Sequence, residues 1–435
     1  MNILFEAAVV LLSREGKLSL DDPIRKYLPE LPATPYGPVT IRQMLNHTSG
    51  IRDWGTLSSL SGWRRGTRQL GNDFVLDLLS KQRELNFPAG TEWSYSNSNY
   101  NLAAIIVERV SGKPFAGFVR DRIFAPAGMT HSSVREDWTR VVKNRATAYD
   151  PVKDGFDADI SIENITGNCC VNTTAGDLLR WSAQAPKFPE LEVVSKLPNG
   201  NSTGYGLGLQ VAKTHGTAEI YHSGATAGWR AFLTRFPEKN LSISLLCNRG
   251  DAPTGSIIRQ VADLFLPTDA EEEKKAFDLA NAGLYRNPKK NAVMRFFVKD
   301  GALRMGFGGN GSAIDAGAIH FENGHVRLTN FSGLEATYDR VDEWKPAPEE
   351  LKKLTGAYRS DEIGVTYEVR LKDGALAAHL DPKTDIALEP TFANAFHAGA
   401  GTLVTFTGDG FDVKSDFGMG SGTARLERLH FTRVK

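Results

Sequence analysis

Hydrophobic residues in the first part of the chain recur at helical spacing. Residues 5–12 are almost entirely apolar and are followed by Glu15-Gly16, which predicts a buried helix that stops at a glycine. Thr40 stands directly before residues 41–45 and is expected to cap a short helix there. Further helices are predicted at residues 102–110, 115–123, 177–181 (with Thr174 and Asp177 at capping-box spacing) and 256–265.

Strand-like segments follow most of these helices. They cover residues 219–222, 229–236 and 241–247, and the turn sequence Pro-Glu-Lys-Asn at 237–240 joins the last two. Those two segments are therefore expected to form a hairpin. Because the strands are clustered after the helices and do not alternate with them, the pattern favours an α+β domain over one built from βαβ units.

The rest of the chain is strand-like, rich in glycine and internally repeated. Residues 268–275 are acidic and polar and mark a domain boundary. Residues 282–287 match residues 355–360, and residues 298–303 match residues 371–376 at the same offset. The second match contains Asp-Gly pairs, which are typical of hairpin turns. The repeat predicts two small antiparallel β-barrels, so that the domains are 1–270, 275–345 and 349–435.

Composition narrows the class of protein. The 435 residues include 51 Lys plus Arg and 51 Asp plus Glu, so no net charge favours nucleic acid as a partner. No apolar run approaches the roughly 20 residues of a membrane span, and no secretory signal opens the chain. The nine histidines are scattered, so neither a metal site nor another cofactor is predicted. Three cysteines cannot supply a disulfide framework, and the adjacent Cys169 and Cys170 are expected to be free buried thiols.

Candidate chemistry begins with the stretch 93–100, Trp-Ser-Tyr-Ser-Asn-Ser-Asn-Tyr, at the mouth of a predicted helix. Tyr95 and Asn97 stand two apart, so Tyr95 could pass on a proton while Asn97 holds a substrate carbonyl group. The alternative is that both are ordinary turn residues. His47, in Asn-His-Thr-Ser-Gly at 46–50, is interpreted as a loop histidine and not as a base, because no acidic residue stands beside it.

These stretches form an ordered set with three others. The five stretches are, in order, residues 16–23, residues 45–50, Tyr95-Ser96-Asn97, residues 177–181 and His222-Ser223-Gly224. On this ordered set the chain resembles the serine β-lactamase-like superfamily. That superfamily includes class C β-lactamases, DD-peptidases, esterases and D-aminopeptidases. The resemblance covers residues 5–265 and implies an antiparallel sheet with helices. The paired barrels resemble those of three-domain D-aminopeptidases.

The resemblance implies an acyl-enzyme mechanism, in which a serine of Ser-x-x-Lys attacks a carbonyl group. Tyr95 would then share proton transfer with the lysine, and Asn97 would orient the substrate. His222 would lie beside the substrate, either binding a substrate carboxylate or stabilising the cleft. Ser223 and Gly224 would bind the substrate through their strand. The implied partner is a small peptide, β-lactam or ester, and the implied location is extracytoplasmic.

The chain departs from the superfamily at the nucleophile. No Ser-x-x-Lys occurs in the 435 residues. Counting back from Gly16 puts the motif's lysine at Asn2 or Ile3 and its serine at or before Met1. The strands that precede this helix in the superfamily are also missing. We therefore expect a family member cut off just after its nucleophile and inactive as given. The alternatives are a non-catalytic penicillin-recognising-type binding protein and an assembly role carried by the barrels.

Overall fold

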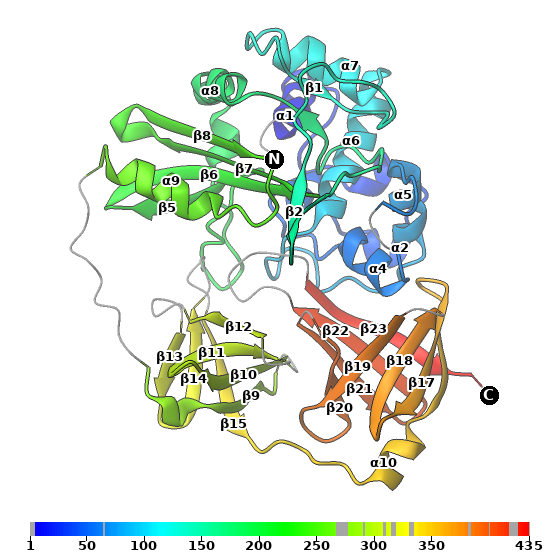
Figure 1. The fold of residues 1–435 in the computed structure, drawn as a ribbon. Coiled ribbons are helices and arrows are strands. Elements are labelled where there is room, and N and C mark those ends of the chain that lie inside the picture. The colour runs from blue at the N-terminus through cyan, green and yellow to red at the C-terminus, as the bar shows by residue number, and fades with distance from the viewer. Residues whose placement is uncertain are drawn as a thin grey trace. The chain divides into compact units, whose positions relative to one another are not determined.

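Two compact units make up the chain (Figure 1). The first unit consists of Met1–Trp54 and Trp63–Glu272, and the second of Gly55–Gly62 and Glu273–Lys435. The predicted boundary at residues 268–275 lies outside the described residues. Within the part of the chain that is described, no helix is long and apolar enough to cross a membrane. The computed structural model describes residues 5–63, 66–266, 277–289, 292–307, 310–314, 319–329, 335–381, 384–399, 401–416 and 425–434.

A long buried helix, α6 (Asn97–Ser111), lies at the centre of the helical part of the first unit. Every residue from Ser98 to Val107 is buried, and Gly112 ends the helix in a left-handed conformation with φ 66°. The helix at 41–45 is confirmed with its cap, because the Thr40 side chain and the Gln43 side chain bond each other's backbone N–H groups. Helices packed against α6 are α1 (Glu6–Arg14), α3 (Ile41–Leu45), α5 (Asn72–Ser80) and α7 (Phe115–Val119).

The predicted strands form one antiparallel sheet in the order β5-β6-β7-β8. The expected hairpin is confirmed: β7 pairs with β8 from Phe236↔Leu241 to Arg230↔Cys247, and Asn240 takes φ 49° in the turn. Among the described strands, β5 and β8 are the edge strands of this sheet. The bounds are β5 (Gln210–Thr214), β6 (Thr217–Thr226), β7 (Trp229–Phe236) and β8 (Leu241–Cys247).

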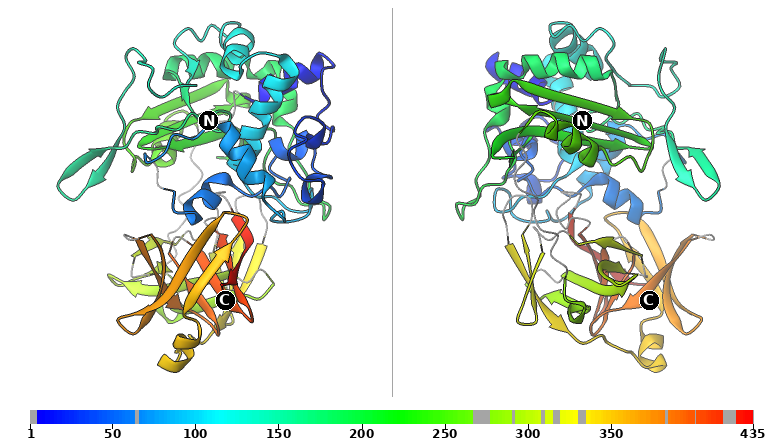
Figure 2. Two further views of the ribbon diagram at one scale, coloured as in Figure 1. Left: turned by 90° about the vertical axis from the view of Figure 1, so that its right-hand side faces the viewer. Right: turned by 60° about the vertical axis from the view of Figure 1, so that its left-hand side comes forward.

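Helices α8 (Ala175–Gln184) and α9 (Thr254–Asp263) cover opposite faces of this sheet. Leu241 and Ile243 pack against the cluster that contains Ala262 of α9, which crosses one face in Figure 2 (right). Ser242, between them, bonds through its hydroxyl to Ser182 of α8 at 2.8 Å. Alternate residues of a strand point to opposite faces, so β8 is covered on both sides.

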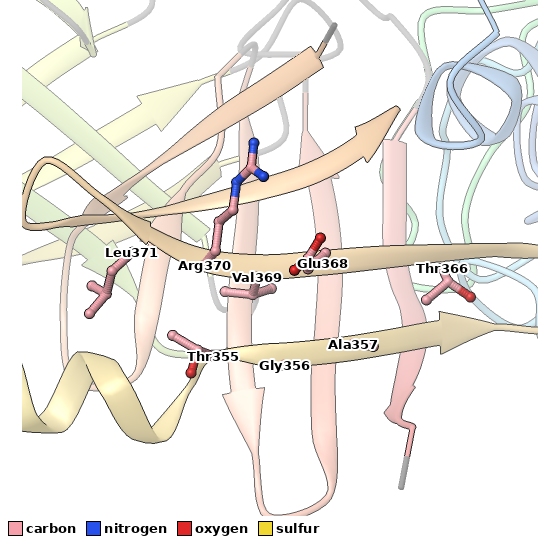
Figure 3. Close-up of a pocket in the computed structure, with 8 residues that line it drawn as sticks. All are labelled: Thr355, Gly356, Ala357, Thr366, Glu368, Val369, Arg370 and Leu371. Atoms are coloured by element: carbon pink, nitrogen blue, oxygen red, sulfur yellow. The ribbon is translucent and has the colours of Figure 1, made fainter. Parts of the chain in front are cut away.

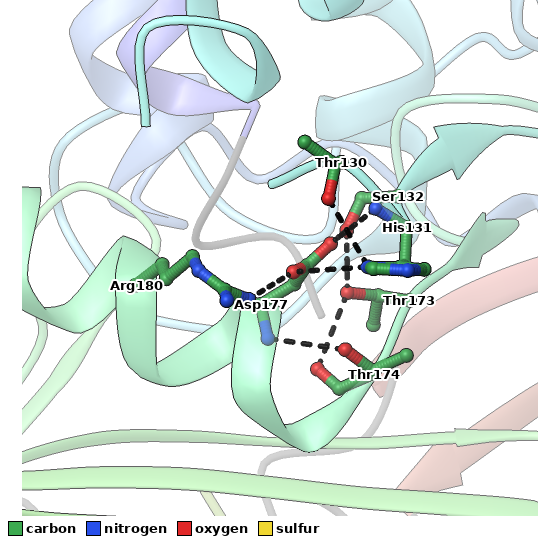
Figure 4. A network of polar contacts seen from close by, with 7 residues as sticks. All are labelled: Thr130, His131, Ser132, Thr173, Thr174, Asp177 and Arg180. Atoms are coloured by element: carbon green, nitrogen blue, oxygen red, sulfur yellow. Dashed lines mark hydrogen bonds and ion pairs between the residues drawn. The ribbon is translucent and has the colours of Figure 1, made fainter. Parts of the chain in front are cut away.

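Asp177 ties the start of α8 to the preceding turn (Figure 4). Its fully buried carboxylate accepts hydrogen bonds from the backbone N–H of His131 and from the hydroxyl of Ser132, both at 2.8 Å. Arg180 donates to the same group at 2.7 Å. The Thr174 half of the predicted capping box is present, because the hydroxyl of Thr174 accepts the N–H of Asp177 at 3.1 Å. The Asp-Leu-Leu-Arg motif thus has a structural role, because it holds the start of α8 to the turn at residues 131–132.

The expectation of free buried thiols at Cys169 and Cys170 is wrong. The two residues form a disulfide with each other, and both are half-buried. Cys170 takes a left-handed conformation with φ 74°, a local turn that no residue pattern indicates. Cys247 is the free cysteine of the described residues. The pair lies just before β4 (Val171–Asn172), which pairs with β1 (Ser133–Val134).

The second unit contains the two predicted β domains. The first is a seven-stranded sheet in the order β12-β11-β10-β9-β15-β14-β13, which is half of a barrel within the described residues. The second is a closed barrel from β16 to β23, preceded by α10 (Pro348–Lys353). Their strands are β9 (Gly283–Asn287), β10 (Ala292–Lys299), β11 (Ala302–Phe307), β12 (Asn310–Ala313), β13 (Ile319–Glu322), β14 (His325–Thr329), β15 (Glu335–Val341), β16 (Gly356–Ser360), β17 (Val365–Lys372), β18 (Ala375–Asp381), β19 (Thr384–Pro390), β20 (Ala395–His397), β21 (Thr402–Thr407), β22 (Gly410–Asp416) and β23 (Arg425–Arg433).

The sequence repeat is a structural repeat. Asp300-Gly301 joins β10 to β11 and Asp373-Gly374 joins β17 to β18, with all four residues at positive φ, as the hairpin prediction requires. Tyr285 and Tyr358, in the matching Gly-x-Tyr-Arg segments, each bond through the hydroxyl to the carbonyl four residues earlier, at 3.0 Å. The two domains therefore share side-chain contacts as well as strand order.

Candidate active site

The segment that carries Tyr95 is held by His47. Nδ1 of His47 accepts the backbone N–H of Ser96 at 3.1 Å, and the carbonyl oxygen of His47 accepts the N–H of Ser94 at 3.0 Å. Tyr95 is thus fixed through the residues on both sides of it. Its half-buried ring lies 4.2 Å from the His47 ring, measured between centroids.

His47 is a neutral, fully buried side chain. Burial, followed by the neighbouring His222, lowers the pKa of His47 well below its ordinary value. Because Nδ1 accepts a hydrogen bond, the proton of the neutral ring lies on Nε2, which has no hydrogen-bond partner among the described residues. These contacts agree with the interpretation of His47 as a loop histidine, with the added role of positioning Tyr95.

Asn97 is the first residue of α6, and Asp53 orients it. Both the backbone N–H and the side-chain Nδ2 of Asn97 donate to Oδ2 of Asp53, at 2.7 and 3.0 Å. Asp53 is buried, with 4% of its surface exposed. A carboxylate at a helix N-terminus also meets the positive end of the helix dipole. Among the described residues, no other group bonds the Asn97 amide, so its oxygen and one N–H are left for a substrate.

The adjacent residue strengthens this connection. The hydroxyl of Ser98 accepts the backbone N–H of Trp54 at 2.8 Å and donates to the carbonyl of Arg52 at 2.8 Å. Residues 52–54 therefore bind the first turn of α6 at several points. The contact between Asp53 and Asn97 was not predicted from the sequence. The two residues are 44 positions apart, and no pattern in the sequence connects them.

His222 lies on β6 and reaches the same region from the sheet. Its ring is 6.2 Å from the Tyr95 ring, so the structure brings these two predicted residues together. Nδ1 donates to the carbonyl of Ser223, and Nε2 accepts from the hydroxyl of Tyr205 at 3.1 Å. Burial lowers the pKa of His222 to about 3, so the ring is neutral at pH 7. A neutral ring favours stabilisation of the cleft over binding a carboxylate by charge.

Ser223 and Gly224 continue β6 beyond the end of its partner β5. The pairing of β5 with β6 ends at Gln210↔Tyr221, whereas β7 remains paired to β6 as far as Thr226↔Trp229. Among the described strands, the β5-facing edge of residues 222–226 is therefore open. An open strand edge offers N–H and C=O groups to an extended ligand.

Glu6 is a further ionisable group that sequence reasoning missed. It lies in the first turn of α1, is fully buried, and its two carboxyl oxygens have no hydrogen-bond partner among the described residues. Burial raises its pKa well above the ordinary value. Gly208, with φ 77°, makes room for the carboxyl group, because a Cβ atom there would overlap it. A lone acid inside an otherwise apolar run, residues 5–12, was the available signal.

The arrangement offers a hydroxyl, an amide and an open strand edge around one region, with neutral histidines behind them. Tyr95 is suited to proton transfer, Asn97 to orienting a carbonyl or amide, and β6 to binding an extended chain. The roles of these predicted residues stay predictions. Asn2 and Ile3, the predicted place of the motif lysine, lie outside the described residues. No group of three or more His, Cys, Asp or Glu side chains in the described ranges is arranged to hold a metal ion.

Comparison with known proteins places these residues in context. The family model described as Beta-lactamase matches residues 5–265. The chain is 28% identical over 304 residues to penicillin-binding protein 4* of Bacillus subtilis, covering 62% of this chain and 66% of that protein. It is 24% identical over 390 residues to a D-aminopeptidase of Brucella canis, covering 86% of this chain and 74% of that protein.

A solved structure resembles the chain over nearly its whole length. The octameric penicillin-binding protein homologue from Pyrococcus abyssi matches with a TM-score of 0.55 at 18% identity, covering 99% of this chain and 87% of that one. At this identity the likeness concerns the fold. It extends through the β domains as well as the first unit, in agreement with the predicted α+β domain followed by two β domains.

Proposed function

Because the chain belongs to the beta-lactamase family, we propose that its first unit carries the substrate cleft of a serine hydrolase of the D-aminopeptidase type. The substrates are amides or esters of small acyl groups, among them D-amino acid amides and short D-peptides. An enzyme that hydrolyses these substrates in this family forms a covalent acyl-enzyme intermediate. The chain itself, which contains no Ser-x-x-Lys, binds such compounds without turning them over.

One observation carries this proposal: residues far apart in sequence converge on one region with complementary chemistry. Tyr95 and His222 come from the entry to α6 and from β6, yet their rings lie 6.2 Å apart. Asn97, two residues after Tyr95, is fixed by two hydrogen bonds to Asp53. Ordinary turn residues do not require a buried carboxylate to orient them, so this fixation supports a functional role.

In the proposed mechanism the substrate lies along the open edge of β6 at residues 222–226. Asn97 bonds the amide group of the substrate with its free oxygen or N–H. Tyr95 transfers the proton between the nucleophile and the leaving group, a contribution typical of general acid–base catalysis. His222 stays neutral and keeps the strand in place through Ser223 and Tyr205. The nucleophile and its lysine have to be supplied by a Ser-x-x-Lys segment.

The test begins with the chain as given. Titration calorimetry should detect binding of D-alanine p-nitroanilide, with Asn97→Ala weakening it at least about tenfold and the L-isomer as the control ligand. The same sample should release p-nitroaniline no faster than buffer. Hydrolysis that a covalent serine reagent abolishes, with the label mapped to a serine of this chain, would show that the nucleophile is present. Equal, weak binding of both isomers would contradict the proposed cleft.

A second function, a non-catalytic penicillin-recognising-type binding protein, is favoured by the absence of Ser-x-x-Lys. The two are separated by joining a Ser-x-x-Lys segment with its flanking strands to the start of the chain. A hydrolase cleft should then hydrolyse D-alanine p-nitroanilide or p-nitrophenyl acetate. A binding protein should retain a β-lactam such as nitrocefin in both forms and hydrolyse none of the three.

A further inference from the structure

The closed barrel of the second unit contains a cavity of its own. Its volume is about 60 Å³. One water-sized sphere occupies roughly 10–15 Å³ on this measure, so the cavity holds about four heavy atoms. Its walls come from strands β17 to β22 and from Leu60, which belongs to the same unit.

The exposure of the wall residues shows where the cavity opens. Its inner end is built by fully buried side chains, among them Val369, Leu388 and Phe411, each 2% exposed. Leu60, Ile386, Ala398 and Thr402 are half-buried. The more exposed part of the lining therefore includes Leu60.

The lining is apolar and its polar atoms are already used. Tyr367 donates its hydroxyl to the carbonyl of Leu60 at 2.7 Å, and burial raises its pKa well above the ordinary value. The hydroxyl of Thr402 bonds weakly to Ser415 at 3.5 Å. A water molecule needs two to four polar partners, so this cavity offers water little and an apolar group a close fit.

A larger hollow on the same barrel has the opposite character (Figure 3). It measures about 630 Å³ and runs along β16 and β17, where Glu368 and Arg370 extend from one side of the strand. Arg370 bonds Asp385 at 2.9 Å, and Asp385 also holds Lys372 at 2.7 Å. Arg370 and Lys372 are thus both paired with Asp385 at the surface.

We propose that the barrel is a binding site for a small aliphatic molecule or the end of a short aliphatic chain, with Leu60 as its gate. Up to about four carbon atoms fit beside Leu60 in its present position. A larger group enters by turning the Leu60 side chain aside, while the hydrogen bond from Tyr367 keeps the Leu60 backbone in place. The site is separate from the proposed cleft and its occupancy does not depend on a nucleophile.

Xenon and cyclopentane test the proposal on the full chain. Xenon fits the cavity as it is, so the ¹²⁹Xe resonance should shift with protein concentration. Cyclopentane requires Leu60 to move, and near saturation it should raise the melting temperature of the second unit by about 2–4 °C. Ala378→Leu fills the cavity and should reduce both effects at least about fivefold. Leu60→Ala widens it and should tighten cyclopentane binding several-fold.

Matched controls keep the test decisive. Thr366→Val changes an exposed side chain next to Tyr367 and should leave both ligands unaffected. If Ala378→Leu does not fold, Val404→Ile adds one carbon to the same wall and should weaken xenon binding in proportion. An unchanged xenon shift in a folded cavity-filling variant would overturn the proposal, as would the lack of any effect of xenon on the unmodified chain.

Discussion

Replacing Glu6 with glutamine should remove a pH dependence from the stability of the first unit. Glutamine keeps the shape of the side chain and cannot ionise. In the folded protein Glu6 is fully buried, and burial raises its pKa well above the ordinary value, so it remains protonated where the unfolded chain has already lost that proton. The perturbation therefore isolates the linkage between one proton and folding.

The sign and size follow from proton counting. Below about pH 4.3, the ordinary glutamic acid pKa, Glu6 is protonated in both the folded and the unfolded state. Its ionisation then does not lower the free energy of unfolding. Between that value and the raised pKa, the folded state holds one more proton than the unfolded state. The free energy of unfolding then falls by about 1.4 kcal/mol for each pH unit gained. Glu6→Gln should thus be the more stable form at pH 7 to 8.

The assay is urea unfolding of the unmodified chain and of Glu6→Gln from pH 5 to 8. The quantity compared is the difference between their free energies of unfolding at each pH. The difference is needed because the pKa values of His47 and His222 are lowered by burial, which makes stability rise with pH below about 6.5 in both proteins. Glu15→Gln, an exposed change beyond the other end of α1, is the control and should leave the slope unchanged. Parallel curves for the unmodified chain and Glu6→Gln would mean that the carboxylate is ionised and compensated, refuting the reasoning.

Four other outcomes are expected. In the chain extended by a Ser-x-x-Lys segment, Tyr95→Phe should lower kcat about 10²-fold or more with little loss of stability, whereas a change in kcat/KM within about threefold would make Tyr95 a helix-entry residue. Asn97→Ala in the same protein should raise KM, lower kcat, or both, as steady-state kinetics will measure. Asp177→Ala should cost about 2–4 kcal/mol in urea unfolding, since it leaves Arg180 and two N–H or O–H donors without their acceptor; Asp121→Ala, at an exposed ion pair, is the control. The chain alone should be poorly soluble because β8 is an open edge, and a monomer that melts cooperatively at an ordinary temperature would contradict this.

The elements that sequence predicted well are those set by local chemistry. The capping box of Thr40 and Gln43 depends only on residues within the same helix, and not on how that helix packs. The hairpin turn at Asp300-Gly301 likewise depends only on the positive φ values of these two residues. The repeat doubled the information on the C-terminal part, so the second turn, at Asp373-Gly374, followed from the first. The end of α1 was predicted correctly, because the helix stops at Arg14 with Glu15 as its C-cap, next to Gly16. Other helix ends were less certain: the helix predicted at 256–265 begins and ends two residues earlier, at Thr254 and Asp263.

The candidate site was predicted in its parts and not in its connections. Tyr95, Asn97 and His222 were found as motifs, and two of their rings do meet. The residues that hold them, Asp53 and Tyr205, are joined to them only by the tertiary fold. A hydrogen bond between positions 44 residues apart has no periodicity to detect. Such partners become visible only when the backbone is in place.

The misjudged cysteines and the underestimated histidine share a physical cause. His47 and Cys170 both adopt left-handed backbone, with φ 60° and 74°, although neither is glycine. This conformation is costly for such residues and persists where surrounding contacts compensate for it. For His47 the compensation is the pairing with Ser94 and Ser96 on either side of Tyr95. The cost of bending the loop at His47 is therefore balanced by the contacts that position the tyrosine, which links the stability of this loop directly to the geometry of the proposed site.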